Sequence, residues 1–415
     1  MTTVIVAPVE GRERRPWAIL RSRSYALLWT AQLASLLGDN ANYVAMAWLV
    51  LVLTGSEVAL GAVLAVAALP RALLMLLGGA LSDRLSPRRT MLLSCAARAV
   101  LMAAVSALVL LHRAALWELF LASLLLGVIS AFFLPARGAA LPRVVDDTQL
   151  EAGNSLLALS AEASNVIGPA LAGIVVAAWG AGAAFVGDAA GYGLAWLCVA
   201  LLPAMASAPA DPAGVRPSIV RDMLDGLRVV WRDSAFRALL GVITVANFFV
   251  GGAITVGLPV LAHEQFSRGA LVLGISFGAW GVGATAGSLV AGMRPAPRRF
   301  GLLLLGAAVW IGIAVGALAV AGSLPLVLAA LAVAGVAGGV VNTYAISWLQ
   351  RRTDPAFQGR VMSLVTLSSA GLEPVALAAA GAVAARSLPL LFGVSGLVVV
   401  ATALAGATSR RLRDA

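Results

Sequence analysis

Long apolar runs constrain the fold of this chain more than any other feature. A run of about 20 apolar residues crosses the hydrocarbon core of a bilayer as a helix. Hydrophobic residues make up 61% of the chain, against roughly 45–50% apolar residues in soluble domains. We therefore predict an all-α membrane protein with twelve transmembrane helices, at 25–53, 58–81, 90–111, 115–135, 151–178, 182–203, 236–262, 270–293, 301–321, 325–349, 360–385 and 388–408.

The basic residues predict how these helices are oriented. The net charge of +10 comes from 29 basic residues, all of them arginine. If the N-terminus lies in the cytoplasm, 24 arginines fall on the cytoplasmic side, in the two tails and in the loops that follow even-numbered runs. Three lie on the opposite side (Arg113, Arg268, Arg386) and two lie inside runs (Arg71, Arg98), which accounts for all 29. Cytoplasmic loops of membrane proteins carry such an excess. Both termini are therefore expected in the cytoplasm, and this distribution argues against a nucleic-acid partner.

The first run carries a polar stripe. Its members share one helical face because they recur at intervals of three, four and seven residues: Gln32, Ser35, Asp39, Asn42, Tyr43 and Met46. Asp39 falls at mid-membrane depth. A polar stripe at this depth is expected to face a cavity or partner helices and not lipid.

Arg71 is the basic residue of the second run. It lies twelve residues before Asp83 and hence about 18 Å from the cytoplasmic turn. The first two runs are antiparallel neighbours, so Asp39 and Arg71 are expected to meet, since a charge at this depth usually has a partner. The pair would either take part in transport or serve only as a structural ion pair that fixes helix packing.

Four further polar side chains inside the runs are candidates for proton coupling or substrate binding. Glu162 and Asn165 share one face of run 151–178, and Asn247 and Asn342 lie in runs 236–262 and 325–349.

Glu373 is a fifth candidate of this kind. It lies about 20 Å along run 360–385 from Arg360. No basic residue of the second half falls at that depth, so Glu373 is expected to be neutral at rest.

A charged turn, 78–89, separates the second run from the third. Gly79 permits close helix approach, Asp83 sits at the water boundary, and Arg84 and Arg88 hold the turn in the cytoplasm. The simpler interpretation is a turn that only fixes topology. These residues follow the pattern G-x-x-x-D-R-x-G-R-[RK], which resembles the loop between helices 2 and 3 of the major facilitator superfamily, although Ser86 and Pro87 depart from it.

A second motif lies in run 151–178. GPALAG, which contains Gly168, Pro169 and Gly173, resembles the antiporter signature of exporters in that superfamily, with Ser164 and Ala172 departing from it. The glycines would permit close helix contact and Pro169 a kink. Together with segments 38–56, 131–145 and 359–364, the chain resembles the drug and siderophore (enterobactin-type) exporter branch.

The resemblance implies two six-helix bundles, 1–203 and 234–415, around a central cavity. They are joined by a cytoplasmic linker, 204–233, whose pattern from Ser218 onward predicts an amphipathic helix. It further implies a secondary active transporter that exports amphipathic small molecules, such as drugs or siderophore-like metabolites, by alternating access. Gly79, Asp83, Arg84 and Arg88 would form its conformational switch.

The same resemblance sets the remaining expectations. The protein is expected in a bacterial inner or plasma membrane as a monomer, with a small-molecule substrate and the lipid bilayer as its partners. Neither a cofactor nor a metal is expected, and the proton gradient would supply the energy.

An enzyme is not expected. GISFG, 274–278, matches a nucleophile elbow in letters only, because it lies inside an apolar run and no histidine is close to it. The sequence has no Walker-type loop, so ATP is not expected to drive the protein directly. Two alternatives stay open: an importer or symporter on the same fold, and a membrane sensor or scaffold that transports nothing.

Overall fold

The computed structural model describes residues 16–82, 86–205, 234–295, 297, 299–353, 365, 368 and 370–408. Helices account for nearly all of them, and no strand occurs in these ranges. The first half contains η1 (Pro16–Arg21), α1 (Arg23–Thr54), α2 (Glu57–Ser82), α3 (Pro87–Leu110), α4 (Leu116–Ala140), η2 (Leu141–Arg143), η3 (Asp147–Gln149) and α5 (Leu150–Ala200). The second half contains α7 (Ser234–Gly252), η4 (Ala253–Gly257), α8 (Leu258–Gln265), α9 (Gly269–Gly292), α10 (Phe300–Ala317), η5 (Leu318–Val320), α11 (Leu324–Arg352), α13 (Glu373–Ala384) and α14 (Leu388–Thr408).

Several sequence predictions fall outside the described residues. They are Asp83 and Arg84 of the charged turn, the amphipathic helix expected in the linker, and segment 359–364. Gly79 lies within α2.

The described helices confirm an all-α membrane fold. Ten helical stretches are long and apolar enough to cross a membrane, and α13 is a shorter apolar helix. The longest, α5, holds two consecutive helices that meet at Gly180, where φ is +81° and ψ is 170°. Glycine takes this positive φ without the steric cost that a side chain would add. The predicted runs 151–178 and 182–203 therefore correspond to the two parts of α5, while the full count of twelve spans stays a prediction.

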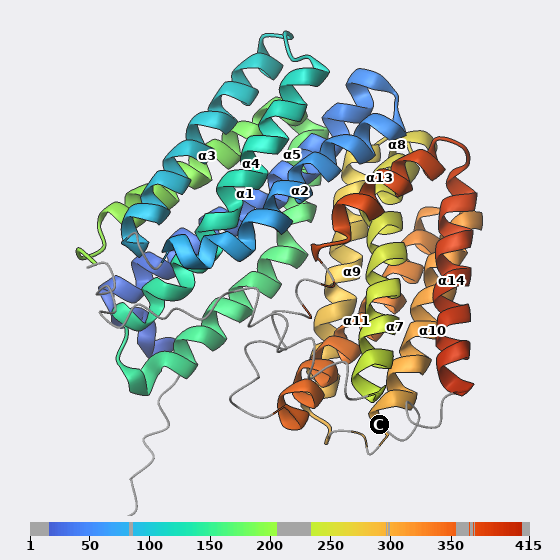
Figure 1. Ribbon diagram of the computed structural model, residues 1–415. Helices are drawn as coiled ribbons and strands as arrows, with labels where there is room; N and C mark the ends of the chain where they lie inside the picture. The colour runs from blue at the N-terminus through green and yellow to red at the C-terminus, as the bar shows by residue number, and fades with distance from the viewer. Residues whose placement is uncertain are drawn as a thin grey trace, which may run out of the picture.

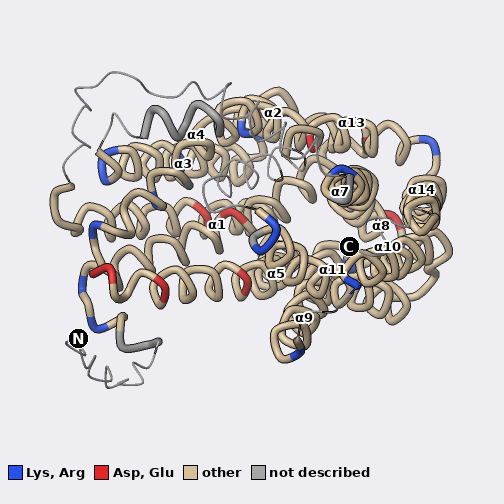
Figure 2. The backbone as a smooth tube through the Cα atoms, turned by 60° about the horizontal axis from the view of Figure 1, so that its bottom comes forward, with Lys and Arg blue, Asp and Glu red and all other residues tan. Residues whose placement is uncertain are grey.

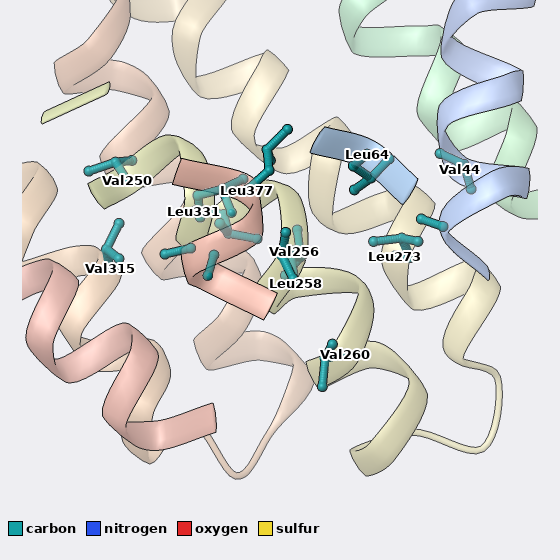
Figure 3. Packing of buried hydrophobic residues seen from close by; sticks show 14 of the residues in the cluster. Val44, Leu64, Val250, Val256, Leu258, Val260, Leu273, Val315, Leu331 and Leu377 are labelled. Carbon is teal, nitrogen blue, oxygen red and sulfur yellow. The ribbon is translucent and has the colours of Figure 1, made fainter. Parts of the chain in front are cut away.

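The helices form two bundles, α1–α5 and α7–α14. Figure 1 shows them leaning together near the α1–α2 turn and α8, and spreading apart toward the opposite end. The bundles meet mainly where α5 packs on α9 and where α2 packs on α13. Buried apolar side chains continue across this junction: Val44 and Leu64 of the first bundle lie in one cluster with Val256 and Leu273 of the second (Figure 3).

Two glycine crossings bring the bundles into backbone contact. A Cβ atom on Gly61 of α2 would lie 2.9 Å from the Cα of Gly381 in α13, and one on Gly173 of α5 would lie 2.8 Å from the Cα of Gly274 in α9. Side chains larger than hydrogen do not fit at such distances without a shift of the helices. The sequence-based prediction that Gly173 permits close helix contact is thus confirmed, and its partner belongs to the other half of the chain.

Candidate functional site

Two cavities lie side by side at the junction of the bundles. The first, called here the N-terminal cavity, has a volume of 340 Å³ and is lined by residues of α1–α5 that include Asp39, Arg71 and Arg98. The second, the C-terminal cavity, has a volume of 580 Å³ and is lined by α7, η4, α11 and α13. Charged residues are sparse along the helices (Figure 2), so the few that line these cavities define the candidate site.

An ion pair joins the two bundles at the boundary of the cavities. Arg71 of the N-terminal cavity donates from Nη2 to Oε1 and Oε2 of Glu373 at 2.8 and 2.7 Å. The two side chains are 47% and 36% exposed, so the pair faces the cavities. Glu373 is the first residue of α13, where the positive end of the helix dipole also favours a carboxylate.

This pair corrects two sequence-based expectations. Arg71 does not pair with Asp39, although both line the N-terminal cavity. Glu373 does not lack a cation, because α2 of the first half supplies one. Both errors have the same cause: partners were sought within each half, whereas α2 packs against α13 across the junction.

A hydrogen bond forms a second link between the bundles. The hydroxyl of Tyr43 in α1 donates to the carbonyl oxygen of Thr255 at 2.6 Å. Thr255 lies in η4, a π-helical turn, and Pro259 four residues later has no N–H to offer that carbonyl. The Tyr43 ring also contacts the Phe277 ring of α9 edge-on, with 5.4 Å between the ring centroids. The Thr255 carbonyl thus serves as an acceptor for a side chain of the other bundle.

Asp39 has its partners within the first bundle. Its Oδ1 accepts a hydrogen bond from the Tyr192 hydroxyl at 2.5 Å and lies 3.6 Å from Nη1 of Arg98. Arg98 is only 2% exposed, and its guanidinium lies 5.2 Å from the ring centres of Phe133 and Tyr192. A carboxylate and two aromatic faces therefore hold Arg98 inside the bundle.

Asp188 was missed as a site residue by sequence reasoning. It is fully buried, and its Oδ2 accepts a hydrogen bond from the Asn42 side chain at 3.2 Å. Its Oδ1 lies so close to α1 that a Cβ on Gly38 would collide with it. A signal was available, because Asp188 and Tyr192 are four residues apart and share a face of an otherwise apolar helix.

Arg137 is a second omission. It was assigned to a cytoplasmic loop because the predicted run 115–135 ends before it. Instead α4 continues through Pro135 to Ala140, and Arg137 lines the N-terminal cavity.

The other predicted residues are spread over several places. Asn247 and Asn342 line the C-terminal cavity, whereas Glu162 and Asn165 are exposed on α5 and line neither cavity. Arg88 donates to the carbonyls of Val199 and Ala200, at 3.2 and 2.6 Å, at the end of α5.

The antiporter-like motif lies in α5, and its first glycine packs against α1. Gly168 lies against Asn40 of α1, so that a Cβ there would be 2.7 Å from the Asn40 Cβ. Pro169 is buried inside α5. Among the described residues, no group of three or more His, Cys, Asp or Glu side chains could hold a metal ion.

Comparison with known proteins adds to this geometry. Residues 28–372 match the sequence profile of the Major Facilitator Superfamily. An uncharacterized MFS-type transporter, y4rN of Sinorhizobium fredii, is 30% identical over 64% of this chain and 65% of its own length, so the chain spans just under two thirds of that relative. The multidrug efflux pump Tap of Mycolicibacterium fortuitum is 26% identical over 90% of this chain and 94% of that protein. The enterobactin exporter EntS of Shigella boydii is 26% identical over 76% and 74%.

Solved structures share the fold at low sequence identity. The nucleoside transporter NupG has a TM-score of 0.72 and 12% identity, covering 92% of this chain and 98% of that one. A bacterial homologue of the human lysosomal transporter Spinster, in an inward-facing and unoccupied conformation, has a TM-score of 0.69 and 14% identity, covering 95% and 98%.

Proposed function

The chain belongs to the Major Facilitator Superfamily, and from that premise we propose that it exports amphipathic small molecules in exchange for protons. The observation that carries the proposal is the Arg71–Glu373 pair, which joins the two bundles between two cavities. Alternating access requires the bundles to rock about a central site. A charged pair that spans both bundles is a group whose partnership such a movement would break.

The composition of the two cavities supports an amphipathic substrate. Phe248, Ile346 and Leu377 line the C-terminal cavity together with the amides of Asn247 and Asn342. Apolar walls with a few polar groups are typical of small-molecule sites. The similarity to an efflux pump and to a siderophore exporter agrees with outward transport of such molecules.

The pair supports proton movement in the direction opposite to that of the substrate. If the arginine distribution places the termini in the cytoplasm, the spread ends of the bundles face the cytoplasm in this conformation (Figure 1). When the bundles rock to open outward, α2 and α13 part and Glu373 loses Arg71. A carboxylate without its cation takes up a proton from outside. When the pair forms again, Arg71 favours the charged carboxylate, and the proton leaves toward the cytoplasm while substrate has moved outward.

The test is transport by the purified protein in liposomes with an imposed pH gradient. Three probes are offered separately: a lipophilic cation, a neutral amphiphile and a catecholate chelator. We expect gradient-driven accumulation of at least one probe, accompanied by movement of protons in the opposite direction. Glu373→Gln should abolish uphill accumulation while downhill exchange continues.

Asp147→Asn serves as the matched control, because Asp147 is exposed in η3, outside both cavities. It should transport as the unmodified protein does. Uphill accumulation by Glu373→Gln at the unmodified rate would refute this coupling role. Substrate and protons moving in the same direction would show a symporter, and no movement of any probe would favour a sensor or scaffold.

A further inference from the structure

Arg137 of α4 is the one cation of the N-terminal cavity without a carboxylate partner among the residues that the structure describes. Its side chain is half-buried and lines the cavity. The other two cations of the lining are paired. Arg71 binds Glu373, and Nη1 of Arg98 lies 3.6 Å from the carboxylate of Asp39. Within the described part of the chain, Arg137 has neither an ion pair nor a hydrogen bond from its guanidinium.

Asp188, the buried carboxylate of α5, does not balance Arg137 either. It accepts a hydrogen bond from Asn42 and interacts electrostatically with Arg98. Arg137 is affected by burial, and no described carboxylate acts on it. A cation partly removed from water without a counter-charge is unfavourable. An anion that enters the cavity and binds Arg137 lowers this cost.

Arg137 lies toward the open end of the cavity. Gly127 of α4 packs on Ala67 of α2, where a Cβ on the glycine would collide with the Ala67 carbonyl. Consecutive helices alternate in direction, so α2 and α4 run the same way. Arg71 follows Ala67 by four residues and Arg137 follows Gly127 by ten. The difference of six residues places Arg137 about 9 Å nearer than Arg71 to the end at which the bundles spread apart (Figure 1).

One face of α4 combines this cation with apolar surface. Four residues recur at intervals of four, three and four positions, so they share a helical face, and all four line the cavity: Leu126, Ser130, Phe133 and Arg137. Arg89 lies at the same end of the bundle but is exposed and lines neither cavity, as expected of an arginine that only anchors a helix. Apolar walls beside a few polar groups are typical of small-molecule sites.

We propose that the N-terminal cavity binds an amphipathic organic anion and that Arg137 holds its anionic group. A planar guanidinium binds a carboxylate or a phosphate through two parallel hydrogen bonds. The apolar part of the molecule lies along Phe133 and Leu126, toward Arg71. Among amphipathic molecules, the protein thus favours anions over cations of the same shape. The role of this anion as a substrate rests on the proposed export function, but its binding does not.

The test is equilibrium binding to the purified protein in neutral detergent, without a gradient and with empty micelles as background. Three radiolabelled probes share one apolar body and differ in charge: naphthalene-2-carboxylate, naphthalene-2-carboxamide and 2-naphthylmethylammonium. We expect the carboxylate to bind most tightly and the ammonium least. A carboxylate that binds no better than the carboxamide, or an ammonium that binds better than either, would overturn the proposal without any variant.

The variants locate the anionic group. Arg137→Gln should weaken binding of the carboxylate about ten- to a hundredfold, the loss that corresponds to a hydrogen bond with a charged group. It should leave binding of the carboxamide unchanged. Arg137→Lys keeps the charge without the paired donors and should give an intermediate affinity. Arg89→Gln, the matched control, should bind all three probes as the unmodified protein does. Equal losses for carboxylate and carboxamide in Arg137→Gln would show that the arginine only supports the fold, and would refute the proposal.

An anionic lipid is another source of the same chemistry, and competition separates the two. Phosphatidylglycerol added to the micelles should leave binding of naphthalene-2-carboxylate unchanged. Displacement by the lipid would show that a headgroup fills the site, and the substrate assignment would be wrong. Anion binding without proton-driven export would contradict the proposed function alone. Export of a cationic probe without anion binding would contradict this inference alone.

Discussion

The walls of the two cavities differ in how their charges are balanced. Arg98 of the N-terminal wall has Asp39 and the buried Asp188 as its partners, and all three residues come from one bundle. The C-terminal wall holds Glu373, whose cation Arg71 belongs to the other bundle. A cluster within one bundle can persist while the bundles move, whereas a pair between bundles depends on their relative position. The first therefore contributes to the stability of its bundle, and the second reports the conformation of the whole protein.

The largest effect is expected when the internal cluster loses its cation. Arg98→Met removes the cation beside Asp39, which is 47% exposed, and beside Asp188, which is fully buried. Leaving a buried polar group without its partner costs about 1–3 kcal/mol, and the free energy of unfolding in detergent should fall by that amount. Adding Asp188→Asn should restore part of the loss, because one carboxyl is removed. Arg113→Met, at an exposed turn, is the control. Unfolding of Arg98→Met at the unmodified midpoint would show that the cluster adds no stability.

A smaller effect is expected at the hydrogen bond between the bundles. Tyr43→Phe removes one donor to Thr255, and a typical hydrogen bond contributes about 0.5–1.5 kcal/mol. The loss should favour conformations in which the bundles have separated here. Spin labels at Arg113→Cys and Arg268→Cys, both exposed, should report a broader distance distribution between the bundles. The native cysteines, Cys95 and Cys198, are buried.

Tyr344→Phe is the matched control for that measurement. The Tyr344 hydroxyl donates to the Arg294 carbonyl at 3.5 Å, within the second bundle. Its loss should leave the distance between the bundles unchanged. Equal broadening in both variants would mean that the Tyr43 bond has no special part in holding the bundles together.

The cavity-facing ion pair should contribute little to stability. Arg71 and Glu373 are 47% and 36% exposed, and exposed ion pairs contribute about 0–1 kcal/mol. A double-mutant cycle of Arg71→Gln and Glu373→Gln should give a coupling energy in that range, although either variant should impair uphill transport. A coupling energy as large as the loss in Arg98→Met would erase the contrast between the two walls.

The smallest effect is expected at Glu162. It is exposed on α5 and lines neither cavity, so Glu162→Gln should change stability by less than about 0.5 kcal/mol. Its gradient-driven transport rate should equal that of the unmodified protein. A loss comparable with that of Glu373→Gln would show that α5 carries a proton-coupling group that the cavity geometry does not reveal.

The sequence was sufficient to predict an all-α membrane fold and the charged residues inside its apolar helices. Helix length follows from apolar runs, and charged residues inside such runs are rare enough to notice. Asp39, Arg71 and Glu373 were found in this way, and all three line the cavities.

The pairing of these residues could not be predicted for a physical reason. Which helices touch depends on how small residues pack across the junction. Arg71 of α2 and Glu373 of α13 are 302 residues apart in the sequence, so no local pattern indicates that they meet. Helix ends were also misjudged at Pro135, because a proline inside a membrane helix is tolerated where neighbouring groups satisfy the freed carbonyl. The contact of Asp188 with Asn42 could not be predicted either, since it requires the helix of 182–203 to face α1.

The two glycine crossings, Gly61–Gly381 and Gly173–Gly274, bear on how abruptly the bundles part. Contact there is backbone against backbone, and dispersion attraction loses a quarter to a half of its strength over a gap of about 0.5–1 Å. The crossings therefore contribute most while the two backbones touch, and less once they have moved apart by about 1 Å. In the proposed transport cycle, these crossings would favour full contact of the bundles over partly separated arrangements.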